Sequence, residues 1–244
     1  MARKPASSTN RTKPAARRAP PAKHLRTQSP ETSGDELSAM VLRACGIARD
    51  SVFNVHDFLA GNSRMAFLAI KDCEKELDQI ERRIDEHLPD AITRVDEATA
   101  RQLLACLKFI TDLERIGDLA YSAVMQLQSR RDRLPALDSQ QLLEMASLLR
   151  GMLEQVHEGF EKRDLRYARS VLQADPEVDR ICHALFQRHL ADSGHAEGAR
   201  NFDVLLTAQA LERIGDHAKN LAEELYGLAE GRSLRHNAKK PSSN

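Results

Sequence analysis

The octapeptide LERIGDLA at residues 113–120 returns as LERIGDHA at residues 211–218, with one position changed. Both copies lie in long stretches rich in Ala, Leu, Glu, Arg and Gln, which are strong helix formers. The same charged motif in two separate helical segments indicates an internal duplication. We therefore predict a chain that is built from two copies of one helical unit.

Apolar periodicity and turn signals divide the chain into six predicted helices, three in each half. Ile70, Leu77 and Ile84 show the spacing of an amphipathic helix. We expect helices at residues 35–60, 64–88, 94–129, 139–161, 164–191 and 199–230. The expected boundary signals are a Ser33 cap, a stop at LPD 88–90, a capping box of Thr93 with Asp96, and an Asp138 cap. Short connections make consecutive helices antiparallel neighbours, which predicts an all-α fold of two tandem three-helix bundles.

The formal net charge of zero hides two basic ends. Residues 1–34 contain eight Lys and Arg against one acid, and residues 231–244 contain four against none. Five prolines in the leader oppose a helix there. We expect a disordered basic tail at 1–34, one bundle at 35–130, a second at 138–231 and a basic C-terminal tail at 232–244, with residues 131–138 as a linker. The tails lack interleaved aromatic residues, so we expect no nucleic-acid partner.

Several classes of protein are disfavoured by motifs that the sequence does not contain. It has no apolar run of membrane-spanning length and no apolar signal segment, so we expect no membrane insertion. The four cysteines have no metal-binding spacing, which favours reduced thiols in a cytoplasmic protein. There is no HExxH, no GxSxG and no glycine-rich phosphate loop. We predict that the protein is not an enzyme.

Each repeated motif places two carboxylates one helical turn apart, beside the apolar stripe. The pairs are Glu114 with Asp118 and Glu212 with Asp216. Two such carboxylates repel each other unless a cation or a basic partner lies between them. Arg115 and Arg213 are candidates for that basic partner.

The second helix of each half carries a matching acidic pair. These pairs are Glu74 with Asp78, a row that Glu81 and Asp85 continue, and Asp175 with Asp179. Carboxylates from two adjacent helices could surround one point in each bundle, and all-oxygen clusters suit hard metal ions. Acidic pairs at this spacing also occur as ordinary solvated faces. A metal site and a solvated face therefore remain two interpretations of the same residues.

Glycine inside each motif is unusual, because glycine in a helix costs about 0.5–1 kcal/mol relative to alanine. We expect a neighbouring helix to approach closely at Gly117 and at Gly215.

We expect that neither His157 nor His217 is a metal ligand. Glu154 with His157 forms a single ExxH, where a di-metal centre needs that element from two helices. His217 points about 100° away from Asp216 around the helix.

Four segments resemble the PhoU family, which comprises accessory proteins and regulators of phosphate transport. They are ITDLERIGDLA at 110–120, ADPEVDRI at 174–181, QALERIGDHAKNLAE at 209–223 and GRSLRH at 231–236. The resemblance extends over about residues 36–236 and is most specific in the third helix of each half. It implies the same fold of two three-helix bundles, in a non-enzymatic cytoplasmic protein that forms a homodimer.

The resemblance also implies metal sites and partners. The family binds iron, zinc, manganese or magnesium through E/DxxxD motifs. Carried over by position, the ligands are Glu74, Asp78, Glu114 and Asp118 in the first half, and Asp175, Asp179, Glu212 and Asp216 in the second. The implied partners are the ATPase subunit of a phosphate ABC transporter and a phosphate-sensing histidine kinase, both restrained when phosphate is abundant.

This chain departs from the family pattern at two places. Pro176 follows Asp175, and a residue before proline disfavours the helical conformation, which would make Asp175 a cap at a kink. Ser122 and Met125 stand where the second repeat has Asn220 and Glu223, so the two sites need not be equal. A di-metal carboxylate enzyme and a metal-free structural interaction protein remain the alternative interpretations.

Overall fold

The computed structural model describes residues 30–61, 63–93, 95–128, 134–191 and 198–230. These ranges contain α-helices and no strand. The helices are α1 (Pro30–Gly61), α2 (Arg64–Ile92), α3 (Glu97–Leu127), α4 (Ala136–Lys162), α5 (Leu165–Ala191) and α6 (Gly198–Glu230). The expectations for the two basic tails fall almost wholly outside the described residues.

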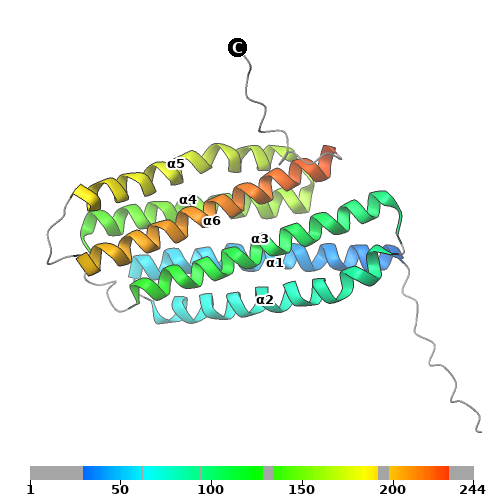
Figure 1. Cartoon of the computed structure of the whole chain (residues 1–244), viewed down its shortest axis with the longest axis horizontal. Coiled ribbons are helices and arrows are strands. Elements are labelled where there is room, and N and C mark those ends of the chain that lie inside the picture. The colour runs from blue at the N-terminus through cyan, green and yellow to red at the C-terminus, as the bar shows by residue number, and fades with distance from the viewer. Residues whose placement is uncertain (1–29, 62, 94, 129–133, 192–197, 231–244) are drawn as a thin grey trace, which may run out of the picture.

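The six helices form two three-helix bundles that lie along each other (Figure 1). One bundle contains α1, α2 and α3, and the other contains α4, α5 and α6. They meet where α1 packs against α4 and where α3 packs against α6. Phe109 of α3 and Phe160 of α4 have ring centroids 4.9 Å apart, so the apolar core continues from one bundle to the other. The predicted all-α fold of two bundles is confirmed.

Side chains fix the start of two helices. Ser63 caps α2, because its Oγ accepts a hydrogen bond from the Ala66 amide at 3.2 Å. Asp96 caps α3, because its Oδ1 accepts a hydrogen bond from the Thr99 amide at 2.8 Å. Each bond satisfies one of the amides that a helix N-terminus leaves without a partner.

The predicted stop at residues 88–90 is wrong, because α2 continues through Pro89 to Ile92. Proline removes one backbone hydrogen bond from a helix. The helix persists because its last turn buries Leu88 and Ala91 in the core. The predicted Thr93 and Asp96 capping box is also wrong, since Thr93 ends α2 and Asp96 caps α3.

Two further predicted caps are wrong. Helix α1 already begins at Pro30, which places Ser33 inside it. Helix α4 begins at Ala136, which places Asp138 in its first turn. Asp138 is 1 % exposed and forms an ion pair with Arg188, and His189 Nε2 lies 3.1 Å from Asp138 Oδ2. Asp138 therefore joins the start of α4 to the end of α5.

The cysteines are free thiols, as the sequence predicts. Cys45, Cys106 and Cys182 are buried in the core. Burial raises the pKa of Cys45 to about 12, which keeps this thiol protonated and unreactive.

Candidate functional site

The first repeated motif faces acidic side chains of α2. Glu114 and Asp118 lie on α3, and the Glu114 side chain is 13 % exposed. The pKa of Glu114 is raised to about 7 by burial and then by the charges of Asp118, Glu81 and Asp78. We call Asp78, Glu81, Glu114 and Asp118 the first acidic cluster.

The first acidic cluster contains a carboxylate oxygen without a hydrogen-bond partner. Glu114 Oε2 is buried and accepts no hydrogen bond. The Arg115 Nε atom lies 3.5 Å away, and Arg115 donates its hydrogen bond to Asp118 Oδ2 instead, at 3.3 Å. Ionising a buried carboxyl group is unfavourable when one of its oxygens accepts no hydrogen bond. A cation beside Glu114 would remove that cost, so the chemistry of this cluster fits a hard metal ion.

Glu81 is part of the first acidic cluster, although it is not one of the eight predicted ligands, because its charge helps to raise the pKa of Glu114. Burial and then Asp85 raise the pKa of Glu81, while a hydrogen bond with Thr111 and the charge of Arg115 lower it. Glu74, the predicted ligand one turn earlier, lies where the backbones of α2 and α3 approach. A Cβ atom built on Gly117 would lie 3.6 Å from the Glu74 Cα.

The second repeated motif faces α5 in the same way. Burial raises the pKa of Glu212, followed by the charges of Asp216 and Asp179. Burial likewise raises the pKa of Asp179, followed by the charges of Asp175 and Asp216. We call Asp175, Asp179, Glu212 and Asp216 the second acidic cluster, and it contains all four predicted residues.

Asp175 is not a cap at a kink, so that expectation is wrong. Helix α5 runs through Pro176, and Asp175 lies inside it with 3 % of its surface exposed. Its side chain faces α6, where Lys219 Nζ donates to Asp175 Oδ2 at 2.5 Å. This tertiary contact outweighs the local preference of a residue before proline.

The two motif glycines differ. A Cβ atom on Gly117 would lie 2.7 Å from Leu77 Cδ1, which is too close. A Cβ atom on Gly215 would lie 3.5 Å from Leu149 Cδ2 and 3.6 Å from Val178 Cγ1, which is ordinary contact. The predicted close approach is confirmed at Gly117 and is wrong at Gly215.

Within the described residues, the ligand atoms of the predicted acids do not converge on one point. Another group of side chains could ligate a metal ion, since one atom from each lies within 4.8 Å of the others. This group is His157, Glu158 and Glu161 on α4. Glu158 there is already paired with Lys162. In each cluster the neighbouring acids help to raise the pKa of two members, which are Glu81 and Glu114 in the first and Asp179 and Glu212 in the second. Side-chain rotation would be needed to bring three acids of one cluster onto one ion.

A third feature is a polar contact between the two bundles that the sequence does not reveal. Asp112 of α3 is 8 % exposed, and its Oδ1 lies 2.8 Å from His217 Nδ1 of α6. Asn220 donates to the same oxygen at 3.4 Å. His217, which the sequence predicts to be a neighbour of the motif, therefore contacts an acid of the other repeat.

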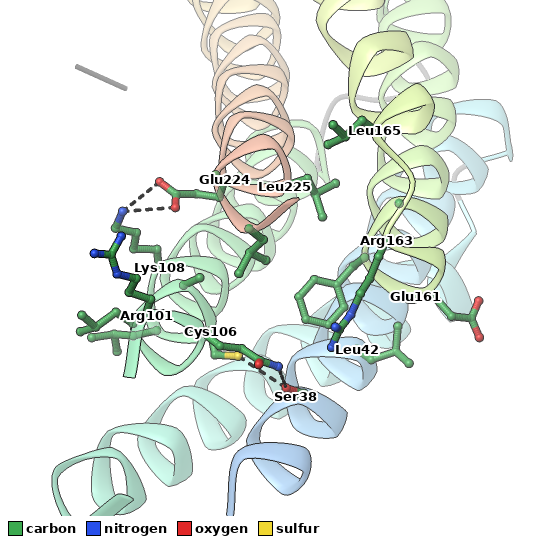
Figure 2. Close-up of a pocket in the computed structure, with 18 of the residues that line it drawn as sticks. Ser38, Leu42, Arg101, Cys106, Lys108, Glu161, Arg163, Leu165, Glu224 and Leu225 are labelled. Carbon is green, nitrogen blue, oxygen red and sulfur yellow. Dashed lines mark hydrogen bonds and ion pairs between the residues drawn. The ribbon is translucent and has the colours of Figure 1, made fainter. Parts of the chain in front are cut away.

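A cavity of about 780 Å³ lies at one end of the molecule, between the two bundles (Figure 2). Leu42, Phe160, Leu165 and Leu225 contribute apolar surface, and an ion pair between Lys108 and Glu224 lies at its side, with Nζ 3.1 Å from Oε1. The residues that line the cavity include none of the eight predicted ligands. The cavity and the acidic clusters are therefore separate features.

No described helix is both long and apolar enough to cross a lipid bilayer. The fold and the two clusters define a class: a tandem-repeat helical protein with paired acidic motifs on facing helices. The PhoU domain matches residues 41–127 and again residues 142–225. The chain belongs to the PhoU family.

Two curated relatives share most of their length with this chain. A phosphate-specific transport system accessory protein PhoU homolog from a Burkholderia species is 29 % identical over 222 residues, which is 88 % of this chain and 94 % of the relative. A protein of the same description from Caulobacter vibrioides is 29 % identical over 204 residues, which is 81 % of this chain and 88 % of the relative.

Two crystal structures share the fold. PhoU from Pseudomonas aeruginosa superposes with a TM-score of 0.74 at 23 % identity, covering 82 % of this chain and 99 % of that one. The phosphate transport system regulatory protein PhoU from Streptococcus pneumoniae gives a TM-score of 0.72 at 21 % identity, covering 84 % and 99 %. Both confirm the architecture of two three-helix bundles.

Proposed function

We propose that this protein regulates phosphate uptake and phosphate-responsive signalling as a metal-binding adaptor in the cytoplasm, without enzymatic activity. The observation that carries the proposal is the PhoU domain in both halves of the chain. The names of the relatives support it, since they describe accessory proteins of phosphate-specific transport.

The metal-binding part of the proposal is supported by Glu114 Oε2, which is buried and accepts no hydrogen bond, although Arg115 Nε lies 3.5 Å away. Asp78, Glu81, Glu114 and Asp118 offer hard oxygen donors from two helices, which suit manganese, magnesium or ferric iron better than softer metals. The bound ion supplies positive charge that offsets the repulsion among these acids and holds α2 against α3.

The proposed partners are the ATPase subunit of a phosphate ABC transporter and a phosphate-sensing histidine kinase, with a homodimer as the working form. Helical surfaces are the binding elements that this fold offers. Exposed apolar side chains supply anchors for such contacts, among them Leu104, Met125 and Phe202.

The test combines genetics with binding. Deletion of the gene should raise expression of a phosphate-starvation reporter in phosphate-rich medium, and the full chain should capture the transporter ATPase and the sensor kinase in a pull-down. Glu114→Gln with Asp118→Asn should weaken capture, while the exposed Glu177→Gln serves as control. An unchanged reporter together with no capture of either protein would overturn the proposal.

A metal-free adaptor is the second candidate, because no three predicted ligands converge on one point within the described residues. It predicts that a chelator changes neither the melting temperature nor partner capture. A di-metal carboxylate enzyme has less support, since such centres use histidine ligands or a positioned acid–base group. The second acidic cluster instead contains Lys219.

A further inference from the structure

The two acidic clusters differ in one internal cation. Lys219 of α6 donates from Nζ to Asp175 Oδ2 at 2.5 Å, and Asp175 is 3 % exposed. This hydrogen bond raises the pKa of Lys219, opposed by burial, and the charges of Asp175, Asp179 and Asp216 raise it further. The ammonium group therefore lies among three of the four acids of the second cluster.

The first cluster has no equivalent lysine. Alignment of the LERIGD copies places Tyr121 at the position of Lys219. Alignment of Asp78 with Asp179 places Glu81 at the position of Cys182. Each cluster contains four acids, and each repeated motif has one arginine. In the first cluster Arg82 pairs with Asp78 at 3.0 Å, but the Arg82 side chain is 72 % exposed and that of Asp78 is 35 % exposed. The second cluster differs because its lysine is hydrogen-bonded to an acid that is almost fully buried.

We propose that the ammonium group of Lys219 offsets the repulsion among the acids of the second cluster, as a bound metal ion does in the first. The two repeats then differ in metal affinity, and the first acidic cluster is the tighter site. This inference rests on the metal-binding part of the proposed function, which it extends by assigning different roles to the two clusters.

The hydrogen-bonding pattern supports this asymmetry. In the first cluster Glu114 Oε2 is buried without a hydrogen-bond partner, so a cation entering there breaks no hydrogen bond of that oxygen. In the second cluster a metal ion must replace a charge-assisted hydrogen bond to Asp175. It must also tolerate the positive charge of Lys219 nearby, which disfavours binding further.

The experiment measures binding of Mn²⁺ alone to the chelator-treated full chain, using the electron paramagnetic resonance signal of free Mn²⁺. Two double variants assign the sites: Glu114→Gln with Asp118→Asn, and Glu212→Gln with Asp216→Asn. Lys219→Met removes the internal cation, and Lys219→Arg keeps it. Lys108→Met is the matched control, because it removes a lysine that pairs with a buried acid, Glu224, outside both clusters. Circular dichroism verifies that each variant is folded.

We expect wild type to show one tight class of Mn²⁺ site that only the first double variant removes. Lys219→Met should tighten binding at the second cluster by at least about tenfold, since it removes a nearby like charge and frees a carboxylate. That gain should vanish when Glu212→Gln and Asp216→Asn are added. Lys219→Arg and Lys108→Met should resemble wild type.

The inference is overturned if wild type binds Mn²⁺ equally tightly at both clusters, or if Lys219→Met gains nothing. Failure of the proposed metal role looks different. In that case wild type binds no Mn²⁺ at the first cluster, whereas a gain in Lys219→Met would still support the role of Lys219.

Discussion

Gly117 of α3 lies so close to Leu77 of α2 that a Cβ atom at position 117 would meet Leu77 Cδ1 at 2.7 Å. Leu77 is fully buried, so it has little room to move away. This contact sets how closely α2 and α3 pack beside the first acidic cluster. Gly215 holds the same place in the second repeat and has normal space around it.

Alanine substitution should separate these two glycines. Gly117→Ala should lower the free energy of unfolding by about 1 kcal/mol, because overpacking of about 1–3 kcal/mol exceeds the gain in helix propensity. Gly215→Ala should leave stability unchanged or raise it by about 0.5–1 kcal/mol. Urea unfolding of both variants measures the difference. Equal effects at the two positions would show that the close approach at Gly117 has no energetic consequence.

The raised pKa of Glu114 predicts a pH-dependent stability of the metal-free protein. The pKa of Glu114 is about 7 in the folded state against an ordinary value of 4.5, so the folded state binds the proton more tightly than the unfolded state. The contribution of Glu114 to stability is therefore fully present below pH 4.5 and is lost as the pH rises through about 7.

Urea midpoints measured between pH 4.5 and 8 in the presence of a chelator test this sign. Glu114→Gln should flatten the profile over that interval. The control is Glu177→Gln, since a hydrogen bond from Arg180 lowers the pKa of Glu177 and removes it from the same interval. A profile that keeps its slope in Glu114→Gln would assign the pH dependence to other groups.

Asp112 and His217 should be energetically coupled across the two bundles. Their contact is part-buried at 2.8 Å, and removing either side chain takes one hydrogen bond from the other. A double-mutant cycle with Asp112→Ala and His217→Ala should give a coupling of about 0.5–3 kcal/mol. The exposed pair Glu177 and Arg180 should show no measurable coupling in the same assay. Additive effects at Asp112 and His217 would argue against a specific contact.

Asp138 should stabilise the protein as the buried partner of Arg188 on α5 and not as a helix cap. Asp138→Ala leaves Arg188 without its acid, and because the Arg188 side chain is 32 % exposed the loss should be about 1.5–3 kcal/mol, the range for a hydrogen bond to a charged group. Loss of a cap alone would cost about 1 kcal/mol. The urea unfolding free energy separates the two interpretations, with the exposed Asp72→Ala as control.

The six helices and their order could be predicted from the sequence because apolar periodicity depends on residues only one turn apart. The LERIGD copies predicted the duplication, the acidic pairs and the tight glycine at position 117. The end of α2 at residues 88–90 was predicted wrongly because burial of Leu88 and Ala91 outweighs the local breaker signal of Pro89. The start of α1 was predicted too late because proline is tolerated in the first turn of a helix, where Pro30 lies.

Only the tertiary structure decided which side chains meet. Lys219 and Asp175 are 44 residues apart, and His217 and Asp112 are 105 residues apart. Periodicity shows which face of a helix is buried, but it contains no information about which residue of another helix that face will meet. The rotation and axial position of packed helices determine those pairs. For that physical reason the sequence determined two similar acidic motifs, and the packing of α5 against α6 placed Lys219 in only one of the two clusters.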